Sequence, residues 1–193
     1  MKRTIWIAVA CATLICAVVA CGSGGGTDDG SLSTGNFKKV CGGEGVEDTA
    51  YYGSSDAFAP IKVFRRSDPD EAYIVFAPQS GDYPAEWHSQ DADQTELVLC
   101  LTVTERELVT ECYYTTEEGG EEIELTEQLY NSTYEAVLRN AATAEEYAST
   151  EFVAETSGEC AEYTLDFTEA EIRRIDADPG AYLVEFLEPW LLP

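Results

Sequence analysis

Apolar stretches alternate with polar turns along most of the chain, which is the pattern of a domain built largely from strands. In the first half, four runs are strand candidates: residues 59–66, 72–77, 97–104 and 108–114. Ser67-Asp68-Pro69-Asp70 separates the first two runs with residues that favour turns. Glu105-Arg106-Glu107 separates the last two, so we expect a hairpin centred on Arg106.

The second half predicts further strands. Residues 123–142 are rich in Tyr and Thr, which favours a long strand, although their alanines also suit a helix. We expect an exposed loop over residues 117–122, and a turn over residues 140–144 that leads into a strand over residues 148–155. Residues 37–46 contain three glycines close to Cys41 and predict an irregular segment on a tight path.

The chain ends in a predicted helix. Asp178 is a good N-cap, and Pro179 suits the first helical position. Apolar residues then recur at helical spacing, namely Tyr182, Leu183, Phe186, Leu187 and Trp190. The predicted fold is therefore a β-rich α+β domain: an antiparallel sheet or sandwich with a short C-terminal helix and two disulfides.

The N-terminus has the pattern of an export signal. Lys2 and Arg3 precede an apolar run over residues 5–20, whose 16 residues are too few for a membrane-spanning helix. Val18-Val19-Ala20-Cys21 resembles the lipobox of bacterial lipoproteins. The resemblance implies cleavage before Cys21 and attachment of a diacylglyceryl group, with fatty acyl chains such as palmitate, to its thiol. The alternative is an ordinary signal peptide with a chance cysteine.

The residues after Cys21 predict a flexible tether. Residues 22–36 are mostly Gly, Ser, Thr and Asp, and Leu32 is their one large apolar residue. The expected organisation is a signal peptide over residues 1–20, a tether over residues 21–36 and a globular domain over residues 37–193.

The charge balance excludes some partners. The chain has 37 acidic and 11 basic residues, a formal net charge of −26. Loss of Lys2 and Arg3 with the signal leaves nine basic and 37 acidic residues, a net charge of −28. Such a protein repels nucleic acid and anionic membrane surfaces, so we expect membrane attachment through the lipid on Cys21 and no nucleic-acid partner.

Cysteines indicate disulfides in the domain. Of seven cysteines, two belong to the signal and Cys21 is the lipid site, which leaves Cys41, Cys100, Cys112 and Cys160. An even number in an exported domain predicts disulfides, and four cysteines allow three pairings.

The expected hairpin centred on Arg106 favours one pairing. It places Cys100 opposite Cys112, close to disulfide distance, and leaves Cys41 for Cys160. The alternative is a zinc site, which lacks closely spaced ligands, since His88 is the only histidine.

Several short motifs look like a family of uncharacterised secreted bacterial proteins. They are Val40-Cys41-Gly42-Gly43-Glu44-Gly45-Val46, Ala50-Tyr51, Pro84-Ala85-Glu86-Trp87, Leu97-Val98-Leu99-Cys100, Cys112-Tyr113, Cys160 and Glu188-Pro189-Trp190. The resemblance implies the fold and the disulfides, and it implies no activity.

These features predict a lipid-anchored, extracytoplasmic protein of the bacterial cell membrane or outer envelope. We expect a non-catalytic module that binds an unknown protein or small molecule, without a cofactor, a metal or catalytic residues. One alternative is an envelope hydrolase that uses His88 or a carboxylate pair, although no Gly-x-Ser-x-Gly motif is present. Another is a calcium-dependent binding module that uses the loop acids of residues 68–71 or 91–93.

Overall fold

The computed structural model describes residues 32–53, 59–77, 84–89, 91–118, 121–162 and 172–191. These belong to one compact unit, residues 32–193. The expected signal peptide, Cys21 and the tether as far as Ser31 lie outside the described residues. Within the described part, no helix has the length and apolar character that crossing a membrane requires.

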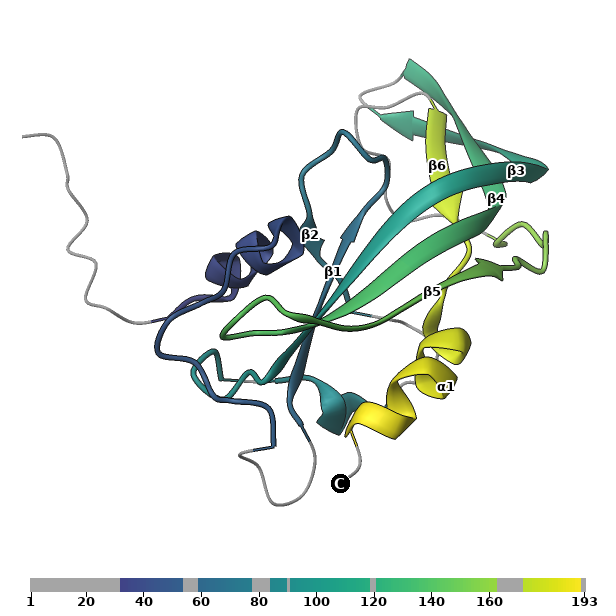
Figure 1. Ribbon diagram of the computed structural model, residues 1–193. Helices are drawn as coiled ribbons and strands as arrows, with labels where there is room; N and C mark the ends of the chain where they lie inside the picture. Colours follow the sequence, from purple (N-terminus) through teal and green to yellow (C-terminus); the bar gives the residue numbers. More distant parts are fainter. Residues whose placement is uncertain are drawn as a thin grey trace, which may run out of the picture. The chain divides into compact units, whose positions relative to one another are not determined.

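A six-stranded mixed sheet forms the framework of this unit (Figure 1). Its strands are β1 (Ile61–Arg66), β2 (Ile74–Val75), β3 (Leu97–Glu118), β4 (Glu121–Asn140), β5 (Glu146–Ala154) and β6 (Ile172–Asp176). They lie in the order β2-β1-β3-β4-β5, and β6 pairs with β4. The predicted β-rich class is confirmed, but the sheet is mixed, because β1 runs parallel to β3 and β6 runs parallel to β4.

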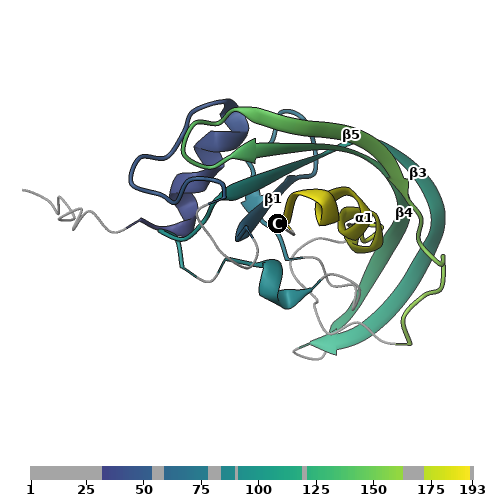
Figure 2. The ribbon, with the colours of Figure 1, turned by 60° about the horizontal axis from the view of Figure 1, so that its bottom comes forward.

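Helices cover the two faces of the sheet. The α-helix α1 (Gly180–Leu191) lies on the concave face (Figure 2), and the 3₁₀ helix η1 (Thr34–Gly42) packs on the other. A short 3₁₀ helix, η2 (Ala85–Trp87), precedes β3. In β3, Leu97, Leu99 and Leu101 pack with the α1 cluster, whereas Val98 and Cys100 pack with the η1 cluster. Burial on both faces explains the continuous apolar run of β3.

The N-terminal helix η1 differs from the prediction. It occupies residues 37–42 of the irregular segment expected over residues 37–46, whereas residues 43–46 are irregular as predicted. It starts at Thr34, inside the expected tether. Phe37 and Val40 are fully buried on one side of η1 and explain why it packs on the sheet. The tight path is confirmed at Gly45, because a Cβ atom there would clash with the carbonyl of Ala142.

The longest strands, β3 and β4, form a bent ribbon whose turn was predicted in the wrong place. Glu105-Arg106-Glu107 lies within β3, and the chain reverses between Glu118 and Glu121, which are paired. Register shifts follow Val103 and Leu108 in β3, so two irregularities flank the charged triplet. Bulges of this kind bend a strand without ending it. The charged triplet was predicted as a turn because it separates two apolar runs, whereas in the structure it lies between the two bulges of one strand.

The disulfide pairing predicted from that turn is also wrong. The bonds join Cys41 to Cys100 and Cys112 to Cys160, each with a Cα–Cα distance of 5.6 Å. Cys100 and Cys112 belong to the same strand, 12 residues apart, and a straight strand of that length spans roughly 40 Å. They cannot reach each other, and each bonds a cysteine of another segment.

The second disulfide holds a segment against the far half of the ribbon. Beyond β5, the Thr156 backbone N–H donates to the Asn131 side chain at 2.9 Å. The Tyr114 hydroxyl donates to the Ala161 carbonyl at 3.1 Å, next to the Cys112–Cys160 bond. Residues 155–162 therefore cross from β4 to β3.

The exposed loop predicted over residues 117–122 is wrong in extent, because β3 continues to Glu118 and β4 begins at Glu121. The other predicted strands and the C-terminal helix are confirmed. The strand candidates over residues 59–66 and 72–77 contain β1 and β2, and those over residues 123–142 and 148–155 correspond to β4 and β5. The C-terminal helix starts as expected, since the Gly180 backbone N–H donates to Asp178 Oδ1 at 2.9 Å.

Candidate functional site

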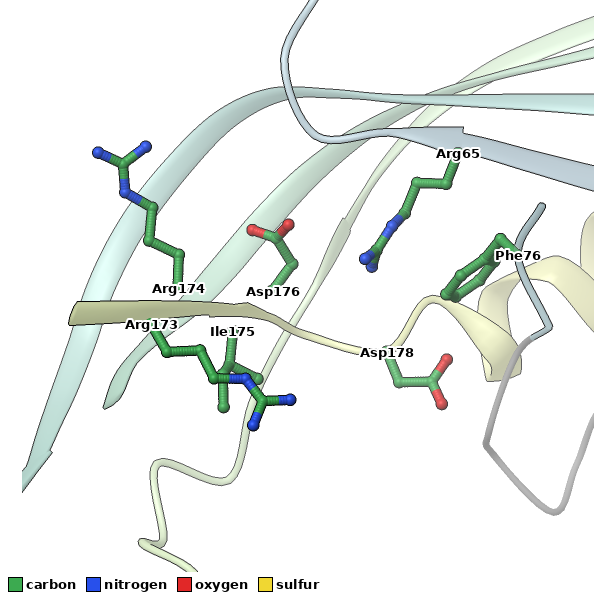
Figure 3. Close-up of a pocket in the computed structure, with 7 residues that line it drawn as sticks. All are labelled: Arg65, Phe76, Arg173, Arg174, Ile175, Asp176 and Asp178. Atoms are coloured by element: carbon green, nitrogen blue, oxygen red, sulfur yellow. The ribbon is translucent and has the colours of Figure 1, made fainter. Parts of the chain in front are cut away.

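Two adjoining hollows lie beside β6, and they form the candidate site. The smaller has a volume of about 260 Å³ and the larger about 490 Å³. Both are lined by Arg65, Arg174 and Asp176. Phe76, Arg173, Ile175 and Asp178 complete the smaller hollow, which is drawn in Figure 3. We call the two together the arginine hollow.

Three segments position these side chains. In β1, Ile61 and Val63 belong to the cluster under α1, and the alternation of a strand places Arg65 on the same face. Phe76 follows β2, where its backbone N–H donates to the Val63 carbonyl at 2.9 Å. The acids come from the junction between β6 and α1, where Asp176 ends the strand and Asp178 caps the helix.

Arg65 reaches into the hollow from β1 (Figure 3). Its guanidinium lies over the Phe76 ring, with Cζ 4.7 Å from the ring centroid. This stacking holds the guanidinium plane while leaving its N–H edge available. Its Nε atom is buried and has no hydrogen-bond partner among the described residues. Because Nε is buried, the terminal nitrogens are the donors that a ligand in the hollow could reach.

Arg106 occupies the larger hollow and is fully engaged. Its Nε donates to Asp176 Oδ1 at 2.6 Å and its Nη2 to Asp176 Oδ2 at 3.2 Å, a bidentate pair. It also donates to Asp68 Oδ1 at 3.2 Å and to the Ser67 carbonyl at 2.6 Å. Ser132 donates to Asp176 at 3.0 Å. Hydrogen bonding to Asp176 raises the pKa of Arg106, so this pair is a fixed, charged wall of the site.

Tyr134 lies next to Arg65 in the core. Its side chain is fully buried, and its hydroxyl donates to the Ala177 carbonyl at 2.8 Å. Burial, together with the negative charge of Asp176, raises the pKa of Tyr134 to about 12. The positive charge of Arg65 and a side-chain hydrogen bond between Arg65 and Tyr134 act in the opposite direction on that pKa. The hydroxyl therefore stays protonated at neutral pH, and it is a neutral neighbour of Arg65.

The arginines at this site differ in their pairing. Arg173 Nη1 lies 3.5 Å from Glu127 Oε1, which is a second internal pair. Within the described part of the chain, neither Arg65 nor Arg174 forms an ion pair. Four of the six arginines that follow Cys21 line the arginine hollow, in a protein with a large excess of acids. The site thus combines two arginines in internal ion pairs with two that form no ion pair with a described residue.

His88, the candidate base of the hydrolase alternative, lies elsewhere. It lines a separate hollow of about 390 Å³ with Lys62, Ser89 and Phe76. Lys62 is buried and donates to the Ser89 carbonyl at 3.0 Å. Burial, and to a smaller extent the charge of Lys62, lowers the pKa of His88, which keeps the imidazole neutral at pH 7. A catalytic histidine is usually oriented by a carboxylate, whereas the charge acting on His88 is positive.

The other predicted site residues are also dispersed. Cys21 lies outside the described residues, and the four domain cysteines are in disulfides. Among the described residues, no group of three or more His, Cys, Asp or Glu side chains is arranged to hold a metal ion. Asp68, one of the proposed calcium ligands, instead accepts a hydrogen bond from Arg106.

Sequence reasoning did not identify the arginines of the arginine hollow as site residues, although Asp68 and Glu71, two of the proposed calcium ligands, line the larger hollow. The available signal was the scarcity of basic residues: only nine follow Cys21, and four of them occur as the doublets Arg65-Arg66 and Arg173-Arg174. When basic residues are this rare in an acidic sequence, paired arginines next to apolar residues mark a candidate binding site. Comparison with known protein families, curated proteins and solved structures found no match. Function is therefore inferred from the chain's own chemistry.

Proposed function

We propose that the chain is a lipid-anchored protein of the bacterial cell envelope that binds a ligand in the arginine hollow without catalysing a reaction. The observation that carries the proposal is the pair of adjoining hollows lined by four arginines. Concave sites with a few convergent polar groups beside an apolar surface are typical of small-molecule sites. Phe76 and Ile175 supply that apolar surface.

The location rests on two separate observations. The two disulfides indicate an extracytoplasmic protein, because such bonds persist in oxidising compartments. The signal sequence and its lipobox-like end at Cys21 support a lipid anchor. Two acyl chains are enough for lasting attachment to a membrane, which one chain does not provide.

We expect Cys21→Ser to abolish lipidation. Without the thiol there is no acceptor for the diacylglyceryl group, so metabolic labelling with radioactive palmitate should no longer mark the protein. The native chain should be labelled and should partition into the detergent phase of a Triton X-114 extract. Cys16→Ser, inside the signal, is the matched control and should leave the labelling unchanged. Palmitate labelling of the Cys21→Ser chain would refute the anchor.

Binding in the arginine hollow is tested by filling it. Ile175→Trp adds a large side chain to the smaller hollow and should abolish ligand capture. Val153→Trp adds the same side chain on β5, where Val153 is 47% exposed, and should have no effect. The mature lipidated chain is purified in detergent after exposure to envelope extract, and native mass spectrometry then reveals bound small molecules. A ligand retained equally by both variants, or none on the native chain, would overturn the proposal.

A further inference from the structure

We infer that the ligand of the arginine hollow is a small organic carboxylate with an apolar body, and that Arg65 recognises its carboxylate. This inference rests on the proposed binding function and adds the chemical class of the ligand. Arg65 provides a planar fork of N–H donors, and two of them match the two oxygens of a carboxylate. The stacking on Phe76 at 4.7 Å fixes the plane in which that pair would form.

The burial of the Nε atom of Arg65 sets the direction of approach. Nε has almost no accessible surface, so a ligand in the hollow would meet the terminal nitrogens of the guanidinium. A carboxylate that approaches end-on would accept from these two nitrogens with its two oxygens. It would also neutralise the charge of Arg65, which forms no ion pair with a described residue. A neutral ligand could accept a hydrogen bond but would leave that charge in place.

The acids of the site favour a carboxylate over a phosphate. Asp176 and Asp178 line the same hollow as Arg65, and Asp176 is already paired with Arg106. A phosphomonoester carries close to two negative charges at neutral pH, and the second charge would be repelled by these carboxylates. A carboxylate carries one, which matches Arg65. The remote acidic residues are largely screened at physiological ionic strength, so the local arginines decide the sign of the ligand.

The rest of the hollow indicates what the carboxylate is attached to. Phe76 beside Arg65 and Ile175 on β6 supply the apolar surface of the hollow (Figure 3), and its volume of about 260 Å³ is too small for a macromolecule. An aliphatic or aromatic body would pack against this surface. The larger hollow, which shares Arg65, leaves space for the body to extend towards Arg174.

The test uses the native mature chain and probes that differ in one property. Phenylacetate is the carboxylate, phenylacetamide its neutral analogue and phenyl phosphate the phosphate analogue; hexanoate replaces the ring with an aliphatic body. Calorimetric titration at millimolar concentrations should show binding of phenylacetate or hexanoate. It should show at least about tenfold weaker binding of the amide and the phosphate.

Single substitutions test whether Arg65 is the residue that contacts the carboxylate. Arg65→Gln removes the charge and should weaken carboxylate binding by about tenfold or more, while the weak binding of the amide should change little. Arg139→Gln removes the same charge near the far end of β4, where Arg139 pairs with Glu146, and should leave binding unchanged. The melting temperature of each variant shows whether it is folded.

A measurement on the native chain makes the test independent of any variant that fails to fold. The terminal N–H signals of Arg65, observed by ¹⁵N NMR, should move downfield when phenylacetate is added and should stay in place with phenylacetamide. Equal binding of acid and amide, tighter binding of the phosphate, or no binding of either carboxylate would overturn the inference. A neutral or cationic molecule captured from envelope extract would also overturn it, while leaving the proposed binding function intact.

Discussion

Replacing Arg106 with alanine is expected to lower the free energy of unfolding by about 3–5 kcal/mol, because it leaves the Asp176 carboxylate without its charged partner. The Arg106 and Asp176 side chains are only 15% and 6% exposed, and the hydrogen bond from Ser132 is the one that Asp176 keeps among the described residues. Arg106 also holds Ser67 and Asp68, and its loss frees the loop after β1 from the ribbon. Denaturation in urea, followed by tryptophan fluorescence, measures the change.

The control is an ion pair whose carboxylate is exposed and whose arginine is 22% exposed. Arg139 lies 3.3 Å from Glu146, whose side chain is 47% exposed, and Arg139→Ala should cost no more than about 1 kcal/mol. A domain of this size has a total stability of roughly 5–15 kcal/mol, so the Arg106 variant should be clearly weakened and the control barely so. Equal midpoints for the two variants would show that Arg106 does not hold the elements together.

Loss of either disulfide is the second large expected effect. Cys41–Cys100 closes a loop with a sequence separation of 59 residues, and Cys112–Cys160 one of 48 residues. In the chain-entropy account, each bond contributes roughly 4 kcal/mol by restricting the unfolded chain. We expect the double variant Cys41→Ser/Cys100→Ser to lose more than this, because Cys100 is also buried in the cluster beneath η1. The urea midpoint provides the comparison with Cys112→Ser/Cys160→Ser.

Single variants test the pairing itself. Cys100→Ser should expose the thiol of Cys41 to an alkylating reagent and leave Cys112 unreactive, since Cys112 stays bonded to Cys160. Peptide mapping of the labelled, non-reduced protein identifies the free cysteine. A label on Cys112 would support the pairing across the hairpin centred on Arg106, and would contradict the observed bonds.

Much of the fold follows from local sequence, and the incorrect predictions of structure share a physical cause. The helix cap at Asp178 and the turn residues between β1 and β2 depend on neighbouring residues, so they could be predicted. The position of Glu105-Arg106-Glu107 within β3 could not be predicted in this way. Arg106 bonds to Asp176, which lies 70 residues further along the chain. An interaction with a distant residue reversed the local preference of a charged triplet.

Contacts between residues distant in the sequence also explain why the arginine hollow was not predicted. β6 has the sequence Ile172-Arg173-Arg174-Ile175-Asp176, which carries more charge than a typical strand, and it pairs with β4 only at a separation of 46 residues. Arg65 and Phe76 come from β1 and the end of β2, and neither marks a site by itself. Only the parallel pairing of β6 with β4 brings the two halves of the arginine hollow together.

The disulfides also connect the cysteines of the domain in a simple order. Along the chain, the first bonds the second and the third bonds the fourth. A polypeptide that enters an oxidising compartment with its N-terminus leading presents Cys41, Cys100, Cys112 and Cys160 in turn. An oxidant that joins each newly arrived thiol to the one still waiting produces the native bonds directly. This topology therefore requires no reshuffling by an isomerase during export, whereas bonds nested across a hairpin would require the first cysteine to wait for the last.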